Sequence, residues 1–138
     1  MKETTKKYLI LGVLVVAVCS VMVFKSLQTH QIAAGLADDS VIGKGKPVLL
    51  ELGSHSCGPC KKMIPILAEL SVEQRVFTVS FVDVWAAEEK SRQYDIKSIP
   101  TQIFFDGEGK ELFRHVGFYP KEDILTKWKE LGVAISSL

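Results

Sequence analysis

Two cysteines three positions apart, Cys57 and Cys60, are the residues of this sequence best suited to chemistry. They enclose Gly58 and Pro59 and stand between an apolar run and a segment with helical periodicity. A cysteine at a helix N-terminus faces unpaired N–H groups and the positive end of the helix dipole, and both favour its thiolate. We therefore predict a redox-active disulfide, in which Cys57 attacks as the nucleophile and Cys60 resolves the mixed disulfide.

A structural disulfide and a zinc or copper site are the alternatives for this pair. A closed zinc site needs four ligands, and the sequence has no second cysteine pair. His55 and His115 are candidates for further ligands, and His30 lies outside the main domain. Lys61 follows Cys60 where c-type haem attachment needs His. We predict no metal site and no bound cofactor, because the dithiol itself is the redox centre.

The cysteine pair needs a strand before it and a helix after it, and the hydrophobic pattern predicts both. An apolar run over 47–52 predicts a buried strand, and apolar residues on one face predict a helix over 61–73. The pattern further predicts strands over 76–83, 101–105 and 111–116, a turn over 106–109, a helix over 86–94 and a last helix from Pro120. The order βαβαββα predicts an α/β domain in which helices cover a mixed sheet.

An uncharged apolar run over 8–24 precedes this domain and extends, through Lys25, to residue 27. A helix of 20 residues is about 30 Å long, which is enough to cross the hydrocarbon core of a membrane. Lysines precede the run, and only Lys25 follows it closely, so the N-terminus is expected in the cytoplasm and the rest outside. We predict a cytoplasmic N-terminus over 1–7, a transmembrane anchor over 8–27, a tether and first element over 28–46, and the folded domain over 47–138.

Other interpretations of the apolar run stay open. A cleaved signal peptide needs a shorter run with small residues just after it, and the nearest candidate, 35–37, lies well beyond. A lipoprotein needs a small residue before its acceptor cysteine, whereas Cys19 follows Val18 deep inside the run. A buried helix of the globular domain is disfavoured, because the run is apolar all round and the rest of the chain suffices for a domain.

Composition excludes several classes of protein. Hydrophobic residues make up 47% of the chain, with 10 Gly and 5 Pro, so the chain is neither collagen-like nor disordered. The 17 basic and 16 acidic residues give a formal charge of +1, and this balance offers no basic excess to a nucleic-acid partner. Three cysteines are too few for a mini-protein held together by disulfides.

The sequence from about residue 47 to 131 resembles the thioredoxin family. Besides Cys-Gly-Pro-Cys, four features carry the resemblance: Pro65 five residues after the second cysteine, the run Ile99-Pro100-Thr101, the hairpin sequence over 104–110, and Gly117 before the last helix. The resemblance implies a thioredoxin fold, in which Pro65 kinks the helix after the cysteines. It also implies that His55, Ser56, Gly58 and Pro59 form the active-site loop.

The resemblance implies roles for residues outside this loop. Pro100 is expected to be cis, and Ile99, Thr101 and Gly117 are expected to bind the backbone of the client protein. Glu51, six residues before Cys57, stands where the family carries a buried acid that shuttles a proton to or from the second cysteine. Burial should raise the pKa of Glu51 toward neutrality, which suits proton transfer.

Three differences from cytosolic thioredoxins refine the expectation. His55-Ser56 stands where these proteins usually have a tryptophan before the first cysteine, and Phe81 lies near the place of a lysine that faces the buried acid. The third difference is the predicted anchor. The whole pattern resembles tethered thioredoxin-like reductases that sit in the cytoplasmic membrane with an extracytoplasmic (periplasmic) domain. That resemblance implies a CcdA/DsbD-type electron donor and clients such as apocytochrome c. A disulfide oxidase or isomerase, and a copper- or zinc-handling protein, are the alternatives.

Overall fold

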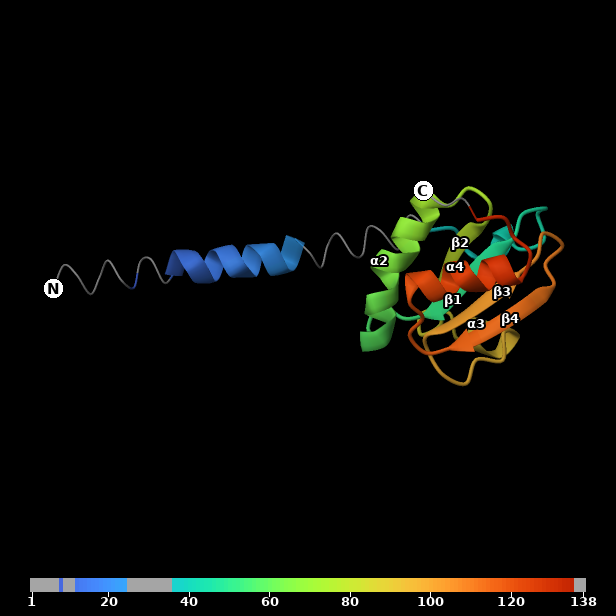
Figure 1. The fold of residues 1–138 in the computed structure, drawn as a ribbon. Helices are drawn as coiled ribbons and strands as arrows, with labels where there is room; N and C mark the ends of the chain where they lie inside the picture. The colour runs from blue at the N-terminus through green and yellow to red at the C-terminus, as the bar shows by residue number, and fades with distance from the viewer. Residues whose placement is uncertain (1–7, 9–11, 25–35, 136–138) are drawn as a thin grey trace. The chain divides into compact units, whose positions relative to one another are not determined.

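The computed structural model describes residues 8, 12–24 and 36–135, and the chain divides into two units, residues 1–31 and 32–138 (Figure 1). In the first unit, residues 12–24 are helical. Within the described residues, no helix combines the length and the hydropathy needed to cross a membrane.

Several predictions for the N-terminal part of the chain fall on residues outside those described. They are the cytoplasmic segment over 1–7, residues 9–11 and 25–27 of the predicted anchor, and residues 28–35 of the predicted tether.

The second unit contains the mixed sheet that the order of elements predicts. Its strands lie in the order β2-β1-β3-β4. The central strand β1 (Val48–Gly53) runs parallel to β2 (Thr78–Asp83) and antiparallel to β3 (Thr101–Phe105), and β4 (Glu111–Val116) pairs antiparallel with β3 at the edge. Every residue of β1 is buried, which explains why its sequence is an almost continuous apolar run.

Each face of the sheet carries its own apolar core. On one face, α2 (Gly58–Glu73) and α4 (Lys121–Glu130) pack against the sheet, as Figure 1 shows. This core contains Leu49, Phe104 and Trp128, and Trp128 is fully buried. On the other face, Val48, Leu50 and Ile103 pack with residues that flank η1 (Asp39–Val41) and follow α3 (Glu88–Gln93). The two cores hold β1 rigid from both sides, and β1 leads directly into the cysteine loop.

Predicted and observed boundaries agree best for the hairpin of β3 and β4. The strands over 101–105 and 111–116 are confirmed residue for residue, and the other strands and α3 begin or end one or two residues from the prediction. The hydrophobic periodicity marks α2 only from Lys61, whereas the helix begins at Gly58, which confirms the predicted place of Cys57 at its N-terminus. Pro59 fits the first turn of a helix, where its missing N–H has no partner to lose.

Pro65 and Pro120 lie inside a helix and at a helix start, respectively. Pro120 is the N-cap of α4, so this helix begins one residue later than predicted, at Lys121. Helix α2 continues through Pro65, which is exposed.

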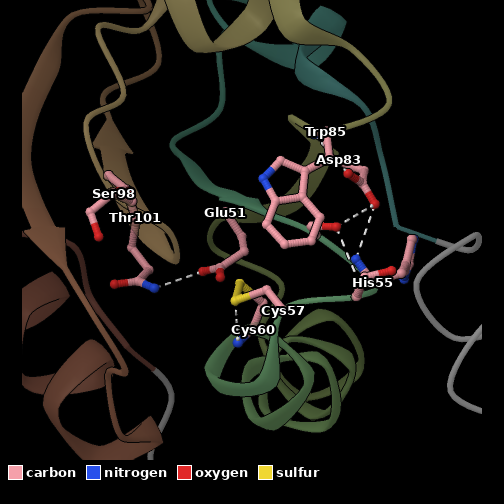
Figure 2. The surroundings of a disulfide bond; sticks show 11 residues. Glu51, His55, Cys57, Cys60, Asp83, Trp85, Ser98 and Thr101 are labelled. Atoms are coloured by element: carbon pink, nitrogen blue, oxygen red, sulfur yellow. Dashed lines mark hydrogen bonds between the residues drawn. A yellow bond between two sulfur atoms is a disulfide. The ribbon is translucent and has the colours of Figure 1, made fainter.

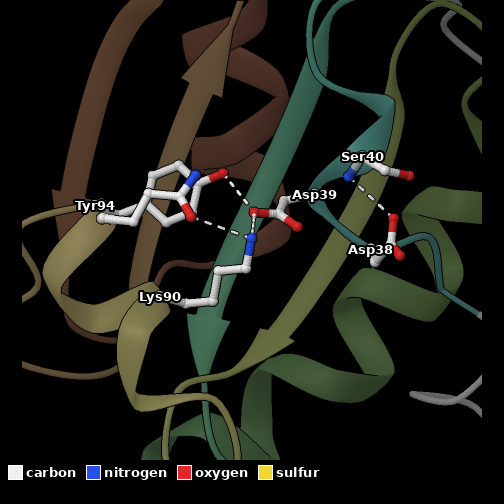
Figure 3. Close-up of polar contacts among 6 residues, drawn as sticks. Asp38, Asp39, Ser40, Lys90 and Tyr94 are labelled. Carbon is white, nitrogen blue, oxygen red and sulfur yellow. Dashed lines mark hydrogen bonds and ion pairs between the residues drawn. The ribbon is translucent and has the colours of Figure 1, made fainter.

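A half-buried polar cluster fixes the segment before β1 to the flank of α3. Figure 3 shows the Asp39 carboxylate accepting hydrogen bonds from Lys90 Nζ at 2.5 Å and from Tyr94 Oη at 2.7 Å. Burial acts to raise the pKa of Asp39, but the hydrogen bonds from Lys90 and Tyr94 outweigh it and hold the pKa below its ordinary value. A second polar contact, from Ser40 N–H to the Asp38 side chain, caps η1. The cluster thus closes the core on the face of the sheet opposite α2.

Candidate active site

The cysteine pair lies at the N-terminus of α2, where the spacing predicts it. Cys57 is the N-cap residue, with extended backbone angles, and its Sγ accepts the Cys60 N–H at 3.3 Å. The two residues form a disulfide with their Cα atoms 5.2 Å apart (Figure 2). Cys60 is 0% exposed and Cys57 is 8% exposed, so only the first sulfur has a path to a partner. Its place at the helix end favours the thiolate of Cys57 once the disulfide is reduced.

Gly53, the last residue of β1, lets the strand approach the disulfide closely. A Cβ atom at this position would lie 3.3 Å from Cys60 Cβ, 3.4 Å from Cys60 Sγ and 3.4 Å from the ring of Phe81. The first of these contacts is tighter than ordinary van der Waals packing, so a larger residue would press against the second cysteine. The sequence analysis used Gly53 only as the end of an apolar run. A glycine directly after a buried strand and before a Cys-x-x-Cys loop was the available signal.

Glu51 is the acid of the site, and the structure confirms that it is buried. Its side chain is 0% exposed on the central strand, and in Figure 2 its carboxyl group points toward the disulfide. Burial raises its pKa to about 8, against a hydrogen bond from Gln102 that lowers it. Phe81 is its register partner on β2, as expected from the missing lysine. Glu51 can therefore hold a proton near neutral pH, which a proton shuttle requires.

The proline loop lies at the start of β3, and the predicted cis peptide bond is confirmed between Ile99 and Pro100. The Pro100 carbonyl accepts the Gly117 N–H at 2.8 Å, which joins the loop to the end of β4. Thr101 is buried and its hydroxyl donates to the Ser98 carbonyl at 2.7 Å. Ile99 is half-buried and packs on the second core. The structure thus brings together the four residues for which the sequence predicts client binding, while their role stays a prediction.

Asp83, which the sequence analysis did not consider, organises the loop before Cys57. Its Oδ2 accepts the His55 N–H at 3.0 Å and the Ser54 hydroxyl at 3.3 Å. Its Oδ1 accepts the backbone N–H groups of Trp85 at 3.0 Å and Ala86 at 3.2 Å. Burial acts to raise the pKa of Asp83, but these backbone hydrogen bonds outweigh it and the pKa is lowered. An acid that directly ends the neighbouring parallel strand was the sequence signal for this role.

The residues around the cysteines divide into a packed side and an exposed side. The His55 ring packs on Phe81, with ring centroids 5.1 Å apart. Ser56 is exposed and its N–H donates to the Ser54 hydroxyl at 3.2 Å. Gly58 and Pro59 are exposed in the first turn of α2. Trp85, tied to the loop through Asp83, is 60% exposed. The site therefore keeps an exposed tryptophan, although it comes from the loop after β2 rather than from the position before Cys57.

The histidines considered as metal ligands have other contacts. His115 stacks on Tyr119 with ring centroids 4.0 Å apart, and its Nε2 lies 3.3 Å from the Phe118 carbonyl. In the part of the chain that the structure describes, no three His, Cys, Asp or Glu residues are grouped so as to hold a metal ion. His30 lies outside the described residues.

Comparisons with known proteins agree on one family. Residues 29–130 match the family model described as thioredoxin. Over 86 residues the chain is 38% identical to a thioredoxin of Mycoplasmoides gallisepticum, a match that covers 62% of this chain and 85% of that protein. It is 36% identical over 106 residues to a thioredoxin of Mycobacterium tuberculosis, covering 76% of this chain and 87% of that protein.

A solved structure supports the fold alone. The crystal structure of thioredoxin NaTrxh from Nicotiana alata matches with a TM-score of 0.59 at 24% sequence identity. The match covers 67% of this chain and 78% of that chain.

Replacing the buried acid by its neutral isostere, Glu51→Gln, should remove a pH-dependent loss of stability. The pKa of Glu51 is about 8 in the folded protein, against an ordinary value of 4.5. Between these values the folded state binds more protons than the unfolded state, so the wild-type free energy of unfolding falls as pH rises. The fall is about 1.4 kcal/mol per pH unit at most. The stabilisation is complete below pH 4.5 and is lost as the pH passes through about 8.

Urea unfolding of the oxidised full chain in detergent micelles at several pH values between 4 and 9 measures this effect. Glu51→Gln should gain stability over the wild-type protein as pH rises. Glu122→Gln, at an exposed position of α4, is the matched control and should follow the wild-type curve. Parallel curves for Glu51→Gln and the wild-type protein would show that Glu51 ionises normally.

Proposed function

This chain belongs to the thioredoxin family, and we propose that it is a membrane-anchored thiol–disulfide reductase for client proteins outside the cytoplasm. Thioredoxin-like disulfide reductase activity rests on the family and on the Cys57–Cys60 pair. The observation that carries it is the position of this disulfide at a helix N-terminus, with Cys57 alone reaching the surface. The membrane anchor, the extracytoplasmic location and the client proteins are further parts of the proposal, and they rest on the sequence pattern.

In the first step, the Cys57 thiolate attacks one sulfur of a client disulfide. A Cys57–client mixed disulfide forms, the client S–S bond breaks, and the other client sulfur leaves as a thiolate that takes up a proton. The N-terminus of α2 favours this step because it stabilises the negative charge on Cys57 before the attack. Ile99, Pro100, Thr101 and Gly117 bind the client backbone beside the cysteine in this proposal.

In the second step, Cys60 attacks Cys57 and releases the reduced client. The thiol proton of Cys60 passes to the Glu51 carboxylate, the Cys57–Cys60 bond forms, and the second client sulfur leaves with the electron pair of the mixed disulfide. The second client sulfur leaves as a thiolate and takes up a proton from solvent. The client has then gained two electrons and two protons, and the protein is left oxidised with the Cys60 proton on Glu51. Cys60 is fully buried, so its proton needs an internal acceptor, and Glu51 lies toward the disulfide from the strand beneath.

The oxidised protein must be reduced again by a partner. Compartments outside the cytoplasm favour disulfides, so the proposed cycle needs a source of electrons. We propose a CcdA/DsbD-type membrane transporter as the electron donor and disulfide-containing clients, with apocytochrome c as one candidate. In this proposal residues 8–27 anchor the chain, residues 28–46 form the tether and first element, and residues 47–138 form the catalytic domain. The long uncharged run and the lysines before it support this arrangement.

Insulin reduction with dithiothreitol tests the catalytic assignment. The wild-type chain should accelerate precipitation of the released insulin chain, and Cys57→Ser should abolish the acceleration because no nucleophile remains. Cys60→Ser should lose turnover but keep a client disulfide on Cys57, visible on a non-reducing gel. Cys19→Ser, which removes the remaining cysteine, is the control and should keep full activity. Turnover by Cys57→Ser would overturn the proposed nucleophile.

The reduction potential of the pair decides between reductase and oxidase. Equilibration in dithiothreitol buffers followed by thiol alkylation should give a reduction potential of about −270 mV, as for thioredoxins with reducing roles. A reduction potential of about −120 mV would instead indicate a strong oxidant.

The membrane anchor predicts both a location and an orientation. The full chain should stay with membranes after an alkaline carbonate wash, whereas a chain lacking residues 1–27 should not, because the apolar run is then missing. In intact cells, a membrane-impermeant maleimide should label Cys57 in the Cys19→Ser background. Labelling only after lysis would place the domain on the cytoplasmic side, and release by carbonate would contradict the anchor.

A further inference from the structure

Gln102 is a buried polar residue that neither the sequence analysis nor the mechanism above uses. It lies on β3 directly opposite Glu51 of β1, and both side chains are 0% exposed. Leu49 and Phe104, their neighbours two positions along on the same face, belong to the apolar core. A buried amide in such a place is unfavourable unless it hydrogen-bonds, so an apolar residue would pack here at lower cost.

The compensating contact is a hydrogen bond to the acid. Gln102 Nε2 donates to Glu51 Oε2 at 2.9 Å. Within the described residues, Glu51 Oε1 has no hydrogen-bond partner. In a protonated carboxyl group the carbonyl oxygen is the stronger acceptor, so an N–H held at Oε2 favours the proton on Oε1. The amide therefore assigns different roles to the two oxygens of Glu51.

We propose that Gln102 is the positioning residue of the buried acid: its amide fixes Glu51 Oε2 and leaves Oε1 as the oxygen that exchanges a proton with Cys60. The proposal rests on the proton-shuttle role of Glu51 in the proposed function. The transfer itself moves one proton from the Cys60 sulfur to Glu51 Oε1 as the Cys57–Cys60 bond forms, and returns it when the disulfide is reduced.

Few other titratable groups face Glu51. From α2 the nearest is Cys60, whose Cβ and Sγ touch the Gly53 end of the same strand. From β2 the register partner is the apolar Phe81, which separates the strand from His55. From β4, His115 is the register partner of Gln102 and so lies one strand further away. The pKa of Glu51 is accordingly raised by burial, with the Gln102 hydrogen bond as the opposing cause.

The proposal predicts that removal of the Gln102 amide raises the pKa of Glu51. An N–H donor stabilises the carboxylate more than the neutral acid, so its loss should raise the pKa of Glu51 further. Gln102→Met keeps the length and unbranched shape of the side chain but has no donor. In this variant a smaller fraction of Glu51 is ionised at neutral pH, and the step that needs the carboxylate as a base should slow.

Carbon-13 NMR of the oxidised full chain, labelled at glutamate carboxyl groups and held in detergent micelles, reads the acid without any turnover. The signal of Glu51 is identified by its loss in Glu51→Gln. Its midpoint should move upward by about one pH unit in Gln102→Met. His115→Gln is the matched control, because His115 pairs with Gln102 from β4, and it should leave the midpoint of Glu51 unchanged. An unchanged midpoint in Gln102→Met would overturn the proposal.

Stopped-flow kinetics provide a second readout. The reduced chain reacts with dithionitrobenzoate, and the second release of thionitrobenzoate reports the attack of Cys60 on the mixed disulfide at Cys57. At pH 7 this second phase should be about tenfold slower in Gln102→Met, the change that one pKa unit produces. In the Glu51→Gln background, Gln102→Met should have no further effect, because a positioning residue acts only through its acid.

The outcomes separate this inference from the proposed function. If Glu51→Gln leaves the pH profile of the second phase unchanged, the proton-shuttle role itself is wrong. If Glu51→Gln changes the profile but Gln102→Met does not, only the role of Gln102 is wrong. Equal slowing by Gln102→Met in both backgrounds would show a purely structural effect and would also overturn the proposal. If Gln102→Met fails to fold, Gln102→Asn replaces it, because its amide is one methylene too short to reach Glu51 Oε2.

Discussion

The N-terminus of α2 needs a hydrogen-bond acceptor, and the sulfur of Cys57 supplies it. One atom therefore ends a helix and carries the chemistry. Since the unpaired N–H groups of a helix favour negative charge, the same geometry that satisfies the backbone also favours the thiolate that attacks. The rest of the site keeps this helix end in place. Gly53 lets β1 pack closely against Cys60. The Asp83 carboxylate accepts backbone N–H groups from His55, in the loop before Cys57, and from Trp85.

The two cysteines occupy opposite electrostatic environments only a few ångströms apart. Cys57 is at the helix end and reaches the surface, whereas Cys60 is fully buried, one turn inside. Burial disfavours a charged sulfur as it disfavours the charged form of Glu51, whose pKa rises to about 8. The proposed order of attack follows from this asymmetry. The exposed thiolate needs no proton acceptor, and the buried thiol needs one within the core.

How much the sequence predicts depends on whether a feature is local. The strands over 101–105 and 111–116 flank a strong turn signal, and both are observed at those residues. The periodic pattern of α2 starts after its first turn, so the pattern alone missed that turn, although the place of Cys57 at the helix N-terminus was predicted and is confirmed. The partners of the active site were missed for a different reason. Gln102 meets Glu51 only through antiparallel register, and Asp83 meets His55 only because parallel strands end together, and neither neighbour can be read from spacing along the chain.

The neutral partner of Glu51 has a consequence for the direction of proton flow. A lysine in this place would favour the carboxylate by charge, whereas Phe81 contributes none and the Gln102 amide contributes only a dipole. The acid is therefore mostly protonated at neutral pH, with a pKa of about 8. In the proposed cycle, when a donor reduces the disulfide, Cys60 leaves as a buried thiolate and can take this proton at once. When a client is reduced, the carboxylate so formed takes it back. One proton stored beneath the disulfide then serves both halves of the cycle, which suits a protein that must be reduced again after each client.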